Sequence, residues 1–366
     1  MIPMGAYIVG GSIVKVDRHF EYGYRDLAYK VLSSCEVCGD PDYIVVASAL
    51  PELMAHQVDL GVHIVQWAGR RVPVVRVESG ESSGVAAVEV ATSLVRSGTA
   101  RKVVVLGVEK VTEYPTYIAN RMYSLILDYE FEVLRGISPP VYAALAMKEL
   151  MRSGFSRECF SSWAVRMHEN ATRVPHAMLR FRISVESFKD AQVLAEPVTL
   201  YDSFALGDGA SAIAISSEPA DYEVAVEVKY SSSEVGLPAY ARDRVSGLEA
   251  STKLFRQLEE KFGVDLRKVA VELHDSYTPY PIALLHSLGY IDTRCELGEL
   301  EYVNLSGGLK ARGHPIGATG IYQVYEVFKL LTGGFDGVSV NSEVGVVHSM
   351  SGPDNLSRVL LLRRWK

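Results

Sequence analysis

The sequence is short of the features that mark several protein classes. It has only 4 cysteines and 3 tryptophans among 366 residues, and its net charge is −7. Four cysteines are too few for the disulfide framework of a small secreted domain. No apolar run reaches the roughly 18–20 residues that a membrane-spanning helix needs. An acidic chain also lacks the basic surface that a nucleic-acid binder requires, so we expect neither a membrane protein nor a nucleic-acid-binding protein.

Neither end of the chain shows a targeting segment. The first residues, MIPMGAYIVGGSIVKV, look like a strand with a Gly-Gly turn and lack the basic start and long apolar stretch of a signal peptide. The last residues, LLRRWK, match no common targeting signal. We therefore expect a cytoplasmic protein.

One pair of cysteines has the spacing of a redox or metal motif. Cys35 and Cys38 lie in the run CEVC, but neither a second such pair nor a nearby histidine completes a zinc site. Cys295 lies in a polar segment. We expect a plain cysteine pair at the end of the first helix and no bound metal.

The chain does have the composition of an ordinary globular protein, with 48% hydrophobic and 22% charged residues. Its length allows two sizeable cores. Strand-like and helix-like segments alternate, which predicts an α/β protein with a mainly parallel sheet covered by helices on both faces. In the first part we expect strands at 6–9, 43–47, 74–77 and 102–107 and helices at 24–32, 58–68 and 82–96.

A second series of elements begins near Tyr222. The run SGESSGVAAVEVATSLVRSG in the first series and the run HPIGATGIYQVYEVFKLLTGG in the second both read as a turn, a helix and a glycine stop. We interpret this as an internal duplication, with halves 1–221 and 222–366 and a helical insertion at about 114–200. In the second half we expect strands at 223–228, 269–273 and 337–340 and helices at 249–262, 281–288 and 318–331.

The run RVESGESSGVAAVEVATSLVRSG, residues 76–98, predicts a sharp turn between a strand and a helix. Turns of this kind often present a nucleophile at the positively polarised start of the helix. The residue at the tip is Glu81. A carboxylate at such a position needs an explanation.

Two histidines, His274 and His314, lie beside sequence patterns that are typical of a ligand site. The run VNLSGGLKARGHPIGATG, residues 303–320, is so rich in glycine that backbone can approach backbone or a ligand closely. His314 stands at its turn into the last long helix, and His274 and Asp275 follow a buried strand, where α/β sheets place ligand-binding residues. Taken singly, each histidine is more often a structural group than a catalyst.

Taken together, these motifs resemble the thiolase superfamily over nearly the whole chain, closest to the sterol-carrier-protein-type thiolases and the archaeal acetyl-CoA acetyltransferases. SGGLKARGHPIGATG is similar to the family's catalytic-histidine motif, and ELHDSY to its HDCF-type motif. GVEKVTE and PVTLYDSFALGDGASAIAI resemble two further family segments. The resemblance implies a thiolase-like fold, in which two duplicated βαβαβ-type halves pack as five layers and carry an inserted loop domain. It also implies at least a dimer.

The resemblance implies a mechanism, from which this sequence departs. In a working thiolase a cysteine at the turn takes the acyl group, the GHP histidine activates it, and the HD histidine holds the thioester oxygen. A second cysteine moves the α-carbon proton. Here Glu81 stands at the nucleophile position and Ser276 at one position of the second cysteine, and the run VVHSMSGPDN, which matches the other, has no cysteine. His274 and His314 remain.

Two interpretations of Glu81 stay open. In the first it forms a structural ion pair with His314 and the protein binds coenzyme A (CoA) or acyl-CoA without conventional thiolysis. Under this interpretation we expect its partner to be an active thiolase or one of the small zinc-ribbon/OB-fold proteins that accompany archaeal thiolases. In the second, Glu81, His274 and His314 support acyl transfer or an altered Claisen or decarboxylation chemistry on acyl-CoA. For CoA itself we single out Gly313 and Gly317 and the basic residues of the insertion, Arg173, Arg180, Arg182 and Lys189.

Overall fold

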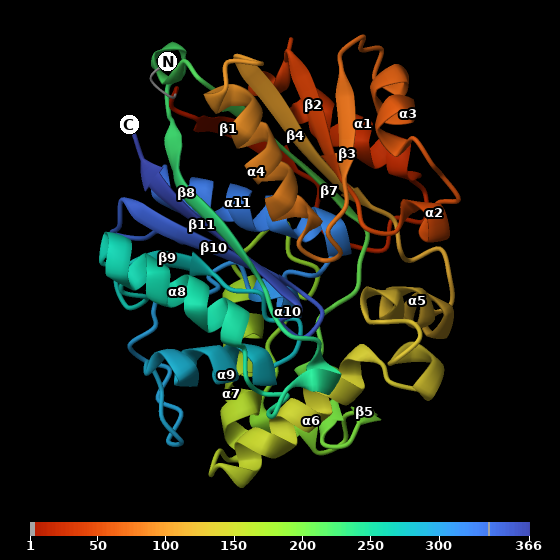
Figure 1. Cartoon of the computed structure of the whole chain (residues 1–366), viewed down its shortest axis with the longest axis vertical. Coiled ribbons are helices and arrows are strands. Elements are labelled where there is room, and N and C mark those ends of the chain that lie inside the picture. Colours follow the sequence, from red (N-terminus) through yellow and green to blue (C-terminus); the bar gives the residue numbers. More distant parts are fainter. Residues whose placement is uncertain (1–3, 336) are drawn as a thin grey trace.

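The computed structural model describes residues 4–335 and 337–366. Nine strands form one sheet in the order β3-β2-β4-β7-β1-β8-β11-β10-β9, and β5 and β6 form a separate pair (Figure 1). The strands are β1 (Tyr7–Ile13), β2 (Tyr43–Ala47), β3 (Val74–Val77), β4 (Lys102–Glu109), β5 (Val193–Ala195), β6 (Val198–Thr199), β7 (Gly209–Ser216), β8 (Val226–Val235), β9 (Ala270–Glu272), β10 (Val344–Ser351) and β11 (Leu356–Arg364).

Helices connect these strands and cover the sheet. The α-helices are α1 (Tyr24–Ser34), α2 (Pro51–Met54), α3 (Leu60–Trp67), α4 (Ser83–Arg96), α5 (Thr116–Tyr123), α6 (Pro139–Arg152), α7 (Arg157–Ala171), α8 (Glu249–Phe262), α9 (Pro279–Leu288), α10 (Gly308–Ala311) and α11 (Thr319–Leu331). Among the described residues, no helix is long and apolar enough to cross a membrane.

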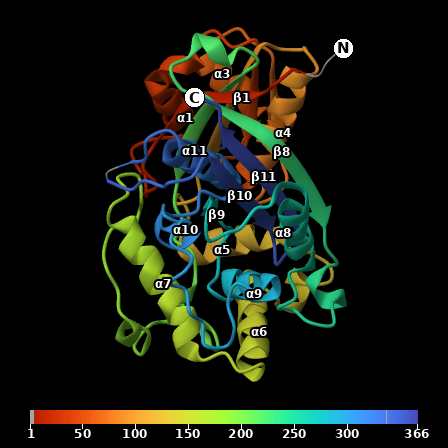
Figure 2. The ribbon, with the colours of Figure 1, turned by 90° about the vertical axis from the view of Figure 1, so that its left-hand side faces the viewer.

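Three large apolar clusters show that the elements stack as five layers. In the first, α1 and α3 pack on one face of β2, β4 and β7. In the second, α4 and α11 lie between the two halves of the sheet and contact both. In the third, α8 and α9 cover the outer face of β10 and β11. The two halves of the sheet meet through only two residue pairs of β1 and β8, and Figure 2 shows the stacking from the side. This is the thiolase-like α/β fold that the sequence predicts.

The sheet is mixed, so the prediction of a mainly parallel sheet is wrong. The pairs β2–β3, β2–β4 and β9–β10 are parallel. The pairs β4–β7, β1–β7, β1–β8, β8–β11 and β10–β11 are antiparallel. The chain between β10 and β11 is too short for a helical crossover, so these two strands must run in opposite directions.

Most predicted elements exist, with shifted ends. The predicted helix at 249–262 matches α8 and the predicted strands at 43–47 and 74–77 match β2 and β3. The predicted strand at 337–340 is wrong, because these residues form a turn and an irregular stretch before β10. The sequence analysis also missed five strands, β5, β6, β7, β10 and β11. The division of the chain at residue 222 remains a prediction.

The two turn-preceded helices of the proposed duplication, α4 and α11, touch each other. A Cβ added at Gly84 of α4 would lie 2.8 Å from the Cα of Gly320 on α11. Only glycine allows backbone to approach this closely. The contact between α4 and α11 holds together the two turns that carry Glu81 and His314.

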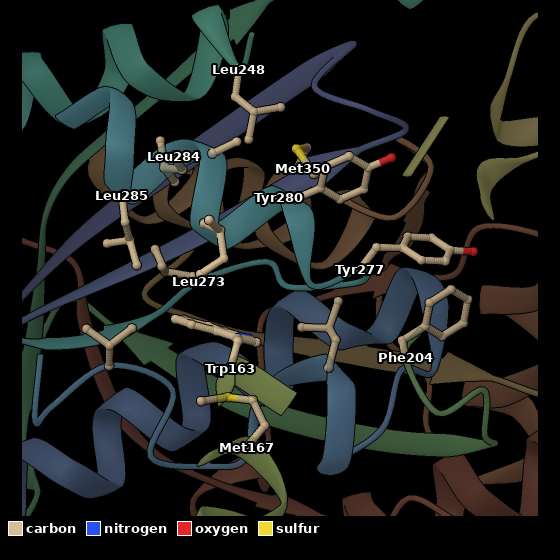
Figure 3. Close-up of a cluster of buried hydrophobic side chains, with 14 of the residues drawn as sticks. Trp163, Met167, Phe204, Leu248, Leu273, Tyr277, Tyr280, Leu284, Leu285 and Met350 are labelled. Atoms are coloured by element: carbon tan, nitrogen blue, oxygen red, sulfur yellow. The ribbon is translucent and has the colours of Figure 1, made fainter. Parts of the chain in front are cut away.

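The insertion does not form a core of its own. Buried residues of α6 and α7, among them Met147 and Trp163, belong to the same apolar cluster as Leu254 of α8 and Leu284 of α9 (Figure 3). The insertion that carries α6 and α7 therefore packs on the helices α8 and α9, which follow residue 222.

All four cysteines are paired, which corrects the expectation of a plain pair at the end of the first helix. Cys35 and Cys38 form one disulfide and Cys159 and Cys295 form the other. Cys35 directly follows α1 and Cys38 ends a short helical turn, which brings their Cα atoms to 5.2 Å. That separation is within the range of disulfides. The second disulfide ties α7 to the segment after α9.

We expect the long-range disulfide to contribute much more stability than the short one. The Cys159–Cys295 bond closes a loop of 136 residues, for which chain entropy gives about 5 kcal/mol, against about 2 kcal/mol for the four-residue loop of the other bond. Cys159→Ser should therefore lower the urea midpoint of unfolding more than Cys35→Ser, measured without reductant. Equal midpoints for the two variants would contradict this.

Helix α4 is not covered on all sides within one chain. Val90 and Ser93 are exposed and, with Glu89 and Leu94, line a groove of about 550 Å³ that also touches Arg358 of β11. The sequence of this helix is mostly Ala, Val and Ser with almost no charge, which predicts a helix packed on all sides at the centre of a dimer. Burial of α4 at the centre of a dimer remains a prediction.

Candidate active site

The strand–turn–helix motif forms as the sequence predicts. The chain leaves β3 at Val77, turns at Gly80 with φ +56° and enters α4 at Ser83. A Cβ at Gly80 would lie 2.1 Å from Oγ of Ser351, so the turn requires glycine. The Ser83 hydroxyl accepts a hydrogen bond from the Ser79 N–H at 2.8 Å. These contacts hold Glu81 two residues before the helix.

The structure brings Glu81, His274 and His314 together in the interior. Their side chains are 2%, 0% and 0% exposed. His314 Nε2 lies 3.1 Å and His274 Nε2 3.5 Å from Glu81 Oε1. Tyr123 donates its hydroxyl to the same oxygen at 2.5 Å, and the backbone N–H of Gly352 donates to Oε2 at 2.8 Å. Both carboxylate oxygens are therefore hydrogen-bonded.

Burial alone would raise the pKa of the Glu81 carboxyl. The adjacent imidazoles of His274 and His314 outweigh burial, so the pKa of this carboxyl lies well below its ordinary value. Glu81 is consequently a carboxylate at neutral pH. A carboxylate with a lowered pKa is a weak base, and its occupied lone pairs make it a weaker nucleophile.

His314 is held in one orientation and is neutral. Burial lowers its pKa to about 4, although the Glu81 carboxylate opposes the shift. Its Nδ1 lies 2.6 Å from Oγ1 of Thr319. Both contacts are satisfied if Nε2–H donates to Glu81 and Nδ1 accepts the Thr319 hydroxyl proton. His314 and Glu81 thus form a neutral-imidazole–carboxylate hydrogen bond at pH 7, rather than the ion pair that the sequence analysis considered.

His274 follows β9, and its ring nitrogens make fewer hydrogen bonds than those of His314. Its ring lies perpendicular to that of His314, with centroids 5.6 Å apart. Neither ring nitrogen has a hydrogen-bond partner among the described residues. Its backbone N–H donates to Nδ1 of His348 at 3.4 Å. Ser276, at the second-cysteine position, is 3% exposed and lies two residues further on.

Aromatic side chains close the site. Phe204 packs edge-on against His314, Tyr123 and Tyr277, with ring centroids 4.8, 5.2 and 5.7 Å apart. Figure 3 shows Phe204 and Tyr277 side by side at one edge of the apolar cluster, with Tyr280 and Met350 next to them. Phe204 comes from the run LYDSFALGDG. These rings pack around His314 beside the Glu81 cluster.

The remaining motifs hold the site in place. Lys110 of the GVEK run pairs with Asp208 of the GDG run at 2.7 Å, and Asp208 also accepts the backbone N–H of Val111 and of Thr112. Asp275 of the HD run accepts the indole N–H of Trp163 at 3.0 Å and the N–H of Leu309 at 2.7 Å. Each buried carboxylate therefore links two segments that are distant in the sequence.

The residues predicted to bind CoA fall into two groups. Gly313 and Gly317 face the chain itself, because a Cβ there would lie 2.5 Å from a side-chain atom of Val16 or from the backbone N of Ala49, respectively. Their small size therefore serves internal packing. The four basic residues that the sequence analysis singles out in the insertion are all exposed: Arg173, Arg180, Arg182 and Lys189.

Two of the four basic residues already contact an acidic side chain. Arg182 forms an ion pair with Glu169 and also donates to it at 2.8 Å. Arg173 lies 3.9 Å from the same carboxylate. Arg180 donates only to the carbonyl of Thr172 at 3.3 Å among its described contacts.

The sequence analysis missed three groups that touch the cluster. Tyr123 lies on α5 in the insertion, where no motif marks it. His348 and Gly352 lie in the run VVHSMSGPDN, of which the prediction used only the absence of a cysteine. The resemblance matches this run to a family segment that carries the second catalytic cysteine. That match could have pointed to His348 and Gly352.

Comparisons with known proteins agree with this geometry. Residues 42–196 match the family model described as thiolase, N-terminal domain, and residues 260–364 match the thiolase C-terminal domain-like model. The acetyl-CoA acetyltransferase of Methanothermobacter thermautotrophicus is 29% identical over 98% of this chain and 99% of its own. Bovine sterol carrier protein 2 (Bos taurus) is 22% identical over 70% of this chain and 52% of its own.

A solved structure, the Ltp2-ChsH2(DUF35) aldolase, has the same fold. It superposes with a TM-score of 0.82 at 19% identity and covers 99% of this chain and 98% of that one. The two family models, the full-length similarity to an archaeal acetyltransferase and the fold agree with the motifs around His274 and His314. The chain belongs to the thiolase family.

Proposed function

We propose that this protein binds CoA thioesters without forming an acyl-enzyme. One observation carries the proposal: Glu81 occupies the position of the nucleophile, and four side-chain and backbone groups surround its carboxylate. A nucleophile must be free to attack, and here both oxygens accept hydrogen bonds. An acyl-carboxylate anhydride would also hydrolyse readily, which makes Glu81 a poor acyl carrier.

A second candidate is acid–base chemistry on an acyl-CoA without a covalent intermediate. The unpartnered ring nitrogens of His274 favour it, because the resemblance gives this histidine the thioester oxygen as its partner. The fold neighbour named as an aldolase shows that this fold also occurs in a protein named for carbon–carbon chemistry. Decarboxylation fits less well, since a substrate carboxylate about 4 Å from Glu81 would meet roughly 4 kcal/mol of repulsion.

The proposal extends to partners and location. The fold neighbour is named with a DUF35 companion, and we propose a comparable small zinc-ribbon/OB-fold companion or an active thiolase as partner. A homodimer and a cytoplasmic location belong to the same proposal.

Calorimetry with CoA and acetyl-CoA tests the binding. The wild-type protein should bind both, and the double change Arg173→Ala and Arg180→Ala should weaken CoA binding about tenfold, since each removes a donor for a phosphate. The matched control is Arg294→Ala, which removes an exposed arginine outside the insertion. No heat from the wild-type protein at millimolar CoA would contradict the proposal. An equal loss of affinity in Arg294→Ala would show that the basic residues of the insertion do not bind CoA specifically.

A further inference from the structure

The Glu81 cluster offers three metal-ligand atoms. One possible ligand atom from each of Glu81, His274 and His314 lies within 4.8 Å of the other two, and all three residues are buried. Two imidazoles and one carboxylate form a ligand set that suits zinc and other divalent first-row metals. In the thiolases that this chain resembles, the position of Glu81 is a cysteine.

The spacing fits tetrahedral coordination. Ligand atoms that are each about 2.0–2.1 Å from a tetrahedral zinc ion lie about 3.3–3.4 Å apart. The distances from Glu81 Oε1 to the two histidine nitrogens are 3.1 and 3.5 Å, on either side of that value. Both Glu81–histidine spacings therefore fit a shared ion, and the ligand atoms of the two histidines lie within 4.8 Å of each other.

His274 supplies an independent reason for a ligand. It is 2% exposed, and neither of its ring nitrogens has a hydrogen-bond partner in the described part of the chain. A buried polar atom left unpaired costs about 1–3 kcal/mol. Its contact with Glu81 is 3.5 Å long and does not satisfy the ring. A cation between the three residues would give His274 the partner that it lacks.

The groups behind the ligands are those of a metal site. His314 uses its other ring nitrogen to contact the Thr319 hydroxyl at 2.6 Å, which fixes the ring with Nε2 toward Glu81. A metal ion on Nε2 requires the other tautomer of the ring, in which Nδ1–H donates to the Thr319 oxygen. The second oxygen of Glu81 accepts the Gly352 N–H. Metal ligands are usually oriented by such hydrogen bonds to their far atoms.

We propose that Glu81, His274 and His314 bind one divalent metal ion, with zinc as the best match. The Tyr123 hydroxyl oxygen lies 2.5 Å from Glu81 Oε1. It is therefore close enough to become the fourth ligand or to be displaced by a water molecule that does. The metal site stands without the proposed function. If both hold, the ion would lie where a thioester oxygen is expected and would polarise it.

Metal binding by the full-length protein tests this proposal. Chelator-stripped protein, kept oxidised so that the Cys35–Cys38 disulfide persists, is titrated with Zn²⁺ and, separately, with Co²⁺. We expect one equivalent to bind at micromolar concentration or tighter and the Co²⁺ form to show the intense visible bands of a tetrahedral site. Glu81→Gln and His274→Ala should each weaken Zn²⁺ binding at least a hundredfold.

Two controls separate this site from others. His63→Ala removes a histidine of α3, and Cys35→Ser removes the only Cys-x-x-C pair in the sequence; both should bind Zn²⁺ as the wild type does. X-ray absorption of the zinc-loaded wild type should show imidazole ligands and no sulfur, which keeps the test valid if a variant fails to fold. No binding by the wild type, sulfur ligation, or full binding by Glu81→Gln would overturn the proposal. CoA calorimetry is separate, so either proposal can fail alone.

Discussion

Changing Glu81→Cys should produce a protein that acquires an acetyl group from acetyl-CoA. The new thiol would stand just before α4, where the helix N-terminus favours a thiolate, and beside His314, which can accept its proton. Intact-mass analysis after incubation with acetyl-CoA should show one added acetyl, and peptide mapping should place it on residue 81. A chelator in the buffer keeps the thiol free of metal. The wild-type protein should show no adduct.

The matched control is Glu81→Ser, which has a hydroxyl of similar size but no thiol. It should stay unmodified, because a serine hydroxyl is not ionised by a neighbouring imidazole to the extent that a thiol is. The acylated cysteine variant should still fail to complete thiolysis or condensation, since Ser276 cannot move the α-proton as a cysteine does. Acetylation at another residue, or of the wild type, would contradict the prediction.

The second large effect is a loss of stability as the pH falls below about 6.5. Burial lowers the pKa of His168 and of His314 to about 4 and that of His348 to about 3. In the unfolded chain these histidines bind protons near pH 6.5. Between those values the unfolded state binds more protons than the folded state, so the free energy of unfolding falls with falling pH. Each histidine contributes about 1.4 kcal/mol per pH unit.

Together the three histidines can remove up to about 8 kcal/mol over two pH units, which is comparable to the whole stability of many domains. Glu81 adds to the loss at lower pH, because its lowered pKa stabilises the fold only above the ordinary glutamate pKa. Urea midpoints measured in chelator from pH 7.5 to 4.5 should fall steeply. The slope should be shallower in His314→Gln and unchanged in His63→Gln. A flat profile in the wild type would contradict the neutral, buried state of these rings.

The sequence predicted the centre of the site better than its surroundings. Glu81, His274 and His314 each stand at the end of a recognisable strand or glycine-rich turn, so their convergence followed from local patterns and the resemblance. Tyr123 could not be found this way. It reaches Glu81 only because the insertion folds over the second half, and that packing depends on contacts between distant segments.

The errors in the fold have the same physical origin. Residues of β7 and β10 are buried nearly throughout, and a short buried strand has no alternation to distinguish it from a helix segment. Strand direction likewise depends on which neighbours pair, so local sequence could not reveal that most pairs of the sheet are antiparallel. The cysteine pairing was missed because Cys159 and Cys295 are 136 residues apart.

Thiolysis of acetoacetyl-CoA by the unmodified protein, with free CoA as the second substrate and an active thiolase as positive control, tests the central claim most directly. Glu81 is enclosed by His274, His314, Tyr123 and Gly352, so we expect CoA to bind and no acetyl-CoA to form above the rate without protein. Steady turnover, accompanied by an acyl adduct on Glu81, would contradict the account.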